Sequence, residues 1–212
     1  MRILYMDCFL GFDARMLLGA LIDAGAATEK IEESLRQKGV NASVIVQSTE
    51  RSSILCKKAT VIADQEAENT LNENNIVKSI SEEYGFSEGT TPATIIAVIC
   101  AAEQLGIDYI ISSEISLPEN TDGRVLELFE RGNIAVCPAD GSTKGTEPAD
   151  AAFLVQISNE NGPKPPMEII SIGYGAGGDN PDNPDIISAI IGEFESDNLF
   201  SYEETEEFAA YL

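Results

Sequence analysis

The stretch ILYMDCFLGFDARMLLGALIDAG, residues 3–25, predicts a strand, a loop and a helix in succession, and the rest of the chain can be ordered around this unit. Its first four residues are apolar and suit a buried strand, whereas apolar residues recur at helical spacing after Asp13, the expected N-cap. Asp7, Cys8 and Gly11 lie between the two elements, where the end of a strand meets the positive N-terminus of a helix. This corner is therefore the first candidate for ligand binding.

Strand patterns and helix patterns alternate along the remaining chain. Helical spacing, first-turn signals and glycine stops predict helices at 28–38, 76–84, 92–105, 125–131 and 148–157. Apolar runs predict strands at 42–50, 54–63, 109–115, 134–137, 168–174 and 186–191. Thr28 is the expected N-cap of the first of these helices. Because each helix must cover a sheet face, the pattern predicts an α/β or α+β fold, with a layered mixed β-sheet covered by helices.

Composition restricts the function classes that need to be considered. The 212 residues include 36 acidic and 13 basic side chains, so the formal net charge is −23. Such a charge repels nucleic acid and anionic membrane surfaces, and we expect neither as a partner. No apolar run reaches the roughly 20 residues that span a bilayer. Four cysteines stand far apart without CxxC spacing, and no secretory leader is recognisable, which predicts a reduced, cytoplasmic protein.

The chain contains no histidine, which limits its metal chemistry. A site for a transition metal would have to use thiolates, carboxylates, carbonyls or a terminal amine. Asp7 and Cys8 are the first candidates for metal ligands because they adjoin the expected corner. The alternative interpretation makes Cys8 a small buried apolar residue. Histidine-dependent nucleophile systems are excluded in this sequence.

Two motifs resemble the LarC family, the nickel insertion proteins of the lactate racemase cofactor pathway. The segments DCFLGFDARM and LGALIDAG, residues 7–16 and 18–25, are similar to the family pattern DCFSGISGDM and LGALIDLG. A second match is IGYGAG at 172–177, followed by a turn and a final strand. The resemblance implies a role in inserting nickel into the pyridinium bisthiocarboxylic acid mononucleotide cofactor, an activity of the nickel chelatase or lyase type.

The resemblance covers only the N-terminal part of the family. It implies a LarC-like domain at 1–193, with a subdivision near the acidic segment 64–75, followed by an acidic tail at 194–212. Partners implied in this way are a separate C-terminal LarC-type domain or further copies of the same chain.

The middle of the chain departs from the family where metal ligands are expected. The family motif HFHEVGAVDSIVDIVG corresponds to residues 85–100, where Gly85 and Ser87 replace histidines and Ala93 and Ala97 replace aspartates. Only Glu88 keeps a donor side chain, and it joins Asp7 and Cys8 as a candidate metal ligand. The resemblance alone implies nickel, and the missing donors predict a degenerate site that holds no metal in this chain.

Two further departures from the family pattern bear on ion binding. Arg15 stands where the family has an aspartate, and its fixed charge would repel a cation. The family segment TPTGAALL corresponds to 147–154, where Glu147 and Asp150 oppose an anion and favour a helix that caps itself.

The glycines at the end of the chain permit two interpretations. Gly173, Gly175 and Gly178 satisfy GxGxxG, but an Asn- and Pro-rich turn follows instead of a helix, which argues against dinucleotide binding. Positive φ angles and close packing in the connection before the last strand are the simpler explanation. Gly173, Gly175 and Gly177, with Gly11, stay as candidate ligand-binding positions.

Three functions therefore remain open from the sequence. The first is a LarC-like nickel insertion domain without the expected ligands, acting with a partner. The second is a non-catalytic interaction or scaffold protein that retains the fold. The third is small-molecule binding at the corner around Asp7 and Gly11.

Overall fold

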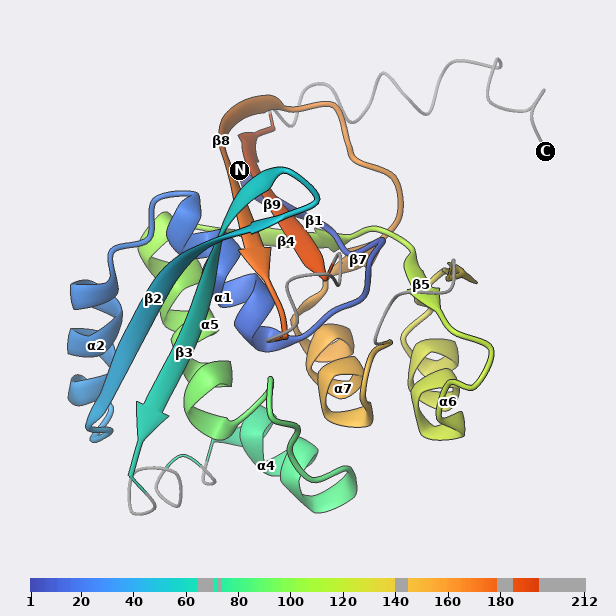
Figure 1. Cartoon of the computed structure of the whole chain (residues 1–212), viewed down its shortest axis with the longest axis horizontal. Coiled ribbons are helices and arrows are strands. Elements are labelled where there is room, and N and C mark those ends of the chain that lie inside the picture. The colour runs from blue at the N-terminus through green and yellow to red at the C-terminus, as the bar shows by residue number, and fades with distance from the viewer. Residues whose placement is uncertain (65–70, 72–73, 140–144, 179–184, 195–212) are drawn as a thin grey trace.

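A mixed β-sheet of seven strands organises the chain (Figure 1). The computed structural model describes residues 1–64, 71, 74–139, 145–178 and 185–194. The spatial order of the strands is β2-β3-β8-β9-β1-β4-β7, and β5 and β6 form a separate two-stranded sheet. The strands are β1 (Arg2–Asp7), β2 (Ala42–Arg51), β3 (Ile54–Ala63), β4 (Tyr109–Ser112), β5 (Ile115–Leu117), β6 (Val136–Pro138), β7 (Glu160–Asn161), β8 (Glu168–Ala176) and β9 (Ile186–Glu193).

Parallel and antiparallel pairs share this sheet. β1, β4 and β7 run parallel to one another, and β3 is parallel to β8. β9 is antiparallel to both of its neighbours, β1 and β8, and β2 and β3 form a long antiparallel hairpin. The predicted mixed sheet with covering helices is therefore confirmed.

The helices gather on one face of the sheet. They are α1 (Ala14–Asp23), α2 (Thr28–Gln37), α4 (Asn75–Glu83), α5 (Pro92–Leu105), α6 (Gly123–Arg131) and α7 (Pro148–Ile157). α1 packs directly on β8, β3 and β9, and α5 lies against α1 and α2. α4 and α6 both contact α7 (Figure 1).

The main core lies between the sheet and these helices. Leu4 and Met6 of β1 point into it, and Phe12 approaches Phe153 of α7 with 6.2 Å between the ring centroids. α5 is buried from Pro92 to Ala101, apart from a half-buried Ile99, as its largely apolar sequence predicts. A small second cluster of Ile3, Ile111 and Phe194 lies on the opposite face of the sheet.

Glycines allow α1 to approach the sheet closely. A Cβ atom added to Gly175 would lie 1.7 Å from the backbone oxygen of Met16, and one added to Gly173 would lie 2.1 Å from that of Ala20. Gly19 of α1 makes the reciprocal approach, because its added Cβ would lie 2.3 Å from the backbone oxygen of Lys57. The glycines of the 172–177 motif therefore belong to β8 and to its contact with α1.

Two local predictions are wrong. α2 begins at Thr28 itself, so its N-cap is Ala27, whose methyl group cannot accept a backbone hydrogen bond. The predicted strand 109–115 is divided, because Ser113 donates its backbone N–H to Met6 at 2.8 Å and the chain then leaves the main sheet to pair β5 with β6. Most of the acidic segment 64–75, and the tail after Phe194, lie outside the described residues.

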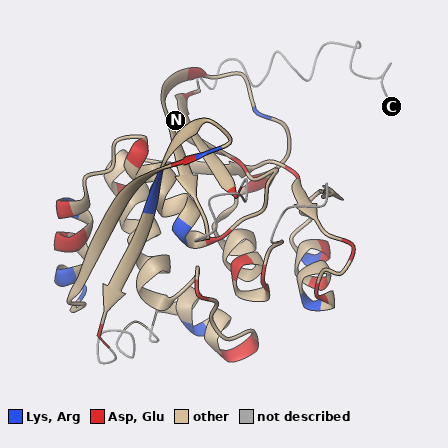
Figure 2. Ribbon diagram, viewed as in Figure 1, with Lys and Arg blue, Asp and Glu red and all other residues tan. Residues whose placement is uncertain are grey.

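Acidic residues are spread along the described chain rather than gathered on one element (Figure 2). They occur on helices, strands and loops, and basic residues are scattered among them. Within the described residues, no helix is both long and apolar enough to cross a bilayer.

Candidate functional site

The corner predicted from residues 3–25 is formed where β1 ends and α1 begins. Asp13 is the N-cap of α1, as predicted, and its carboxylate accepts the backbone N–H of Met16 at 2.8 Å. Gly11 has a φ of 100° and donates its N–H to the Cys8 carbonyl at 2.9 Å, which closes the turn between the two elements. Asp7 stays exposed at the end of the strand and accepts the backbone N–H of Phe9 at 3.3 Å.

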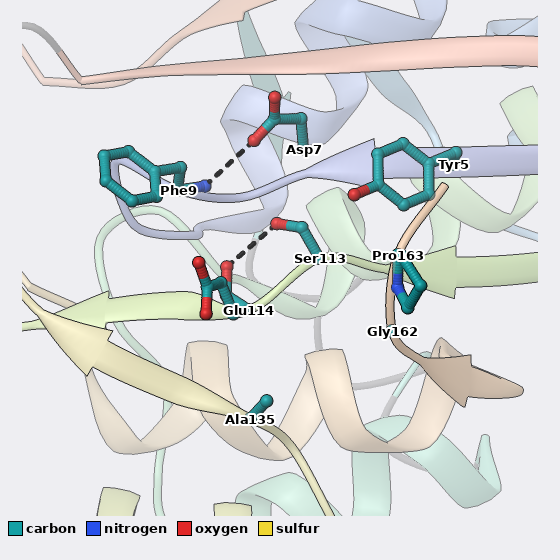
Figure 3. Close-up of a pocket in the computed structure, with 8 residues that line it drawn as sticks. All are labelled: Tyr5, Asp7, Phe9, Ser113, Glu114, Ala135, Gly162 and Pro163. Atoms are coloured by element: carbon teal, nitrogen blue, oxygen red, sulfur yellow. Dashed lines mark hydrogen bonds between the residues drawn. The ribbon is translucent and has the colours of Figure 1, made fainter. Parts of the chain in front are cut away.

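A cavity of about 540 Å³ opens beside Asp7 (Figure 3). The parallel strands β1, β4 and β7 all end at this edge of the sheet, which is where open α/β sheets place their ligands. Six of the lining residues are Tyr5, Asp7, Phe9, Ser113, Glu114 and Pro163. Sequence reasoning found only Asp7 among them. Tyr5 and Phe9 lie in the same motif, but an aromatic residue there is no specific sign of a ligand site, and the other lining residues come from distant parts of the chain.

Cys8 lies on the core side of this corner. Its side chain is fully buried, and its backbone N–H donates to the Ser113 hydroxyl at 2.9 Å. Burial, aided by the negative charge of Asp7, raises the pKa of the thiol well above its ordinary value. The thiolate that a metal requires is thus disfavoured in this conformation, and the geometry supports the interpretation of Cys8 as a buried apolar residue.

Glu88 is placed near α1 and lines neither of the larger cavities that Asp7 borders. Its side chain is 77% exposed and lies 3.7 Å from the Arg15 guanidinium, which is also 3.6 Å from Asp13. Among the described residues, no group of three or more cysteine, aspartate or glutamate side chains is arranged to hold a metal ion.

A buried polar cluster lies behind the corner and joins three of the sequence motifs. Asp150 accepts the Ser87 hydroxyl at 2.8 Å, the Thr90 hydroxyl, and the backbone N–H of Glu147 at 3.2 Å. The bond from Glu147 confirms the predicted self-capped helix. Burial and the nearby charge of Asp13 raise the pKa of Asp150 to about 7.

Backbone groups at the start of α1 also form hydrogen bonds with the residues next to this cluster. Thr90 accepts the backbone N–H of Ala14 at 3.1 Å, and Arg15 donates its backbone N–H to the Gly89 carbonyl at 3.2 Å. Gly89 and Thr90 therefore fix the N-terminus of α1. The only hint of this arrangement in the sequence was one aspartate within an otherwise apolar helix, ADAAFL.

The candidate ligand-binding glycines occupy different environments. Gly173 and Gly175 face α1 at distances that leave no room for a ligand. Gly177 donates its N–H to the Asp185 carbonyl at 3.0 Å and so helps close the β8–β9 connection. Gly11 borders a cavity of about 20 Å³ that Asp13, Asp150 and Asp185 also line.

Comparison with known proteins identifies the family. The family described as nickel insertion protein matches residues 4–94 and 82–209. The pyridinium-3,5-bisthiocarboxylic acid mononucleotide nickel insertion protein of Geobacillus kaustophilus is 29% identical over 91% of this chain and 60% of its own length. The protein of the same name from Staphylococcus epidermidis is 27% identical over 92% of this chain and 60% of its own length. The one from Acetivibrio thermocellus is 26% identical over 84% of this chain and 57% of its own length.

The chain thus spans about 60% of the length of the first of these relatives. No solved structure matches it. The family match covers both motifs on which the resemblance rested, at 7–25 and 172–177, and confirms it. This chain belongs to the nickel insertion protein family.

Proposed function

We propose that this chain takes part in the insertion of nickel into pyridinium-3,5-bisthiocarboxylic acid mononucleotide, the activity named for its relatives. The family match at 4–94 and 82–209 is the observation that carries the proposal. The proposal includes a partner, either a separate domain of the kind that the longer relatives carry or further copies of the same chain. Its four free cysteines support a reducing, cytoplasmic location.

The chemistry of the corner supports nickel transfer rather than nickel storage. The acceptor in the relatives' name carries thiocarboxylic acid groups, and sulfur ligands hold nickel more tightly than isolated carboxylate oxygens do. Exposed carboxylates such as Asp7 and Glu88 would therefore bind nickel weakly and release it to the acceptor. The buried thiol of Cys8 would not compete while it stays protonated.

Calorimetry with nickel tests this proposal. The protein must be free of a histidine tag, because a tag would supply the ligand type that the chain lacks. We expect the affinity for nickel to fall at least about tenfold in Asp7→Asn. The loss should be smaller in Glu88→Gln, because the wild-type Glu88 carboxylate already faces the positive charge of Arg15. Glu130→Gln, an exposed change on α6, is the matched control for the general acidity of the surface.

Mass spectrometry of the mononucleotide after incubation with nickel and the protein gives a second readout. Incorporation of one nickel atom that depends on Asp7 would support the proposal. The proposal would be overturned if the protein showed no nickel incorporation and bound nickel no more tightly than the Asp7→Asn variant. The non-catalytic scaffold function would then take its place.

A further inference from the structure

The cavity beside Asp7 has a chemistry that the mononucleotide does not match. Its lining combines two aromatic rings, Tyr5 and Phe9, with two carboxylates, Asp7 and Glu114, and includes no lysine or arginine among the described residues. The mononucleotide joins one pyridinium cation to a phosphate and two thiocarboxylic acid groups, so its net charge is negative and these carboxylates would repel it when no metal ion is bound. The cavity therefore fits a ligand of opposite charge.

Both aromatic rings and both carboxylates line this cavity. Tyr5 and Asp7 project from β1 on the side opposite the main core, Phe9 follows from the turn, and Glu114 comes from the segment between β4 and β5 (Figure 3). Phe9 is 49% exposed, so its ring remains open to a ligand.

The cavity is also of a suitable size and lies at the ends of paired strands. A volume of about 540 Å³ lies within the range of small-molecule sites. Ser113 helps hold its floor, since its hydroxyl accepts the Cys8 N–H and donates to the Glu114 carbonyl at 2.8 Å. β1 and β4 are paired in register up to this point, with Met6 opposite Ser112.

We propose that this cavity binds a planar organic cation that carries no anionic substituent, with its ring against Tyr5 or Phe9 and its positive charge near Asp7 and Glu114. Aromatic faces attract such cations through their quadrupoles, and the two carboxylates add direct attraction. This site is separate in ligand class from the proposed nickel transfer, although both would use Asp7.

Three probes of one shape and different charge test the proposal. These are 1-methylnicotinamide, a cation, nicotinamide, which is neutral, and nicotinate, an anion. Ligand-observed NMR titrations with the full chain at fixed ionic strength should show the cation binding at least about tenfold more tightly than nicotinamide, with no detectable binding of nicotinate.

Variants separate the cavity from the general field of the acidic protein. Tyr5→Leu, Phe9→Leu and the double change Asp7→Asn with Glu114→Gln should each weaken binding of the cation about fivefold or more, while Glu130→Gln leaves it unchanged. Circular dichroism of each variant confirms that it is folded. Equal binding of nicotinamide and 1-methylnicotinamide, or an equal loss in Glu130→Gln, would overturn the proposal. Nickel calorimetry of the Tyr5→Leu variant keeps the two functions apart, because Tyr5 is not a candidate nickel ligand.

Discussion

Asp150 is held in surroundings that favour its neutral form. The residue is 4% exposed, and the pKa of its carboxyl group is raised from 3.8 to about 7 by burial and by Asp13. In the unfolded chain the same group ionises near its ordinary value. The folded state thus binds this proton more tightly, and the stabilisation is complete below about pH 4 and is lost as the pH rises to about 7.

The variant Asp150→Asn should remove this pH dependence. Relative to the variant, the wild-type protein should lose up to roughly 4 kcal/mol of unfolding free energy between pH 4 and pH 8. Guanidinium unfolding at several pH values measures the difference. A gap between the two proteins that stays constant with pH would show that Asp150 does not change its protonation in this range.

The contact between α1 and β8 is set by the absence of side chains at a few positions. A Cβ atom at Gly175 would meet the backbone of Met16 and of Ala20, and backbone cannot move aside as a flexible side chain can. The helix would have to lift away from the sheet, and its contacts with β3 and β9 would loosen with it.

Gly175→Ala should therefore destabilise the protein by about 3 kcal/mol or more. Gly123→Ala is the matched control, because a Cβ at the first residue of α6 has no atom within 4 Å and should change stability by less than about 1 kcal/mol. Denaturant unfolding followed by circular dichroism measures both. Similar small effects at the two glycines would contradict the close approach of α1.

Elements whose signals are local could be predicted from the sequence. Asp13 was recognised as a helix start because an N-cap bonds to a backbone N–H only three residues away. Thr28 misled the same reasoning, because a cap residue and a first helical residue look alike in a sequence. The order of strands and helices was recovered for the same local reasons, except that β7 was missed and β4 and β5 were predicted as one strand.

The site was less accessible to this reasoning because its contacts are distant in the sequence. Glu114 and Asp7 line one cavity because β1 and β4 pair in parallel, and these strands come from distant parts of the chain. Likewise, Ser87 and Asp150 are 63 residues apart, and their hydrogen bond depends on how α7 packs. Asp7 and Gly11 were found because both lie inside one continuous motif.

At the scale of the whole molecule, the net charge of −23 opposes the compact state. Raising the salt concentration from about 10 mM to about 150 mM shortens the screening length from about 30 Å to about 8 Å and weakens this repulsion. The melting temperature should rise by several degrees, as differential scanning calorimetry would show. Glucose at equal osmolarity is the control, because it does not screen charge. A melting temperature that falls with added salt would mean that ion pairs such as Lys78–Glu82 outweigh the repulsion.

The strand order has a consequence for synthesis on the ribosome. β8 and β9, which are formed from residues 168–176 and 186–193, lie in the middle of the sheet, between the β2–β3 hairpin and β1. While the chain is still being translated, the first three strands therefore have no central neighbours to join them. α1 likewise lacks the glycine surface of β8 on which it rests. The β2–β3 hairpin and the strands β1, β4 and β7 can therefore join into one sheet only after residues 168–193 have been synthesised.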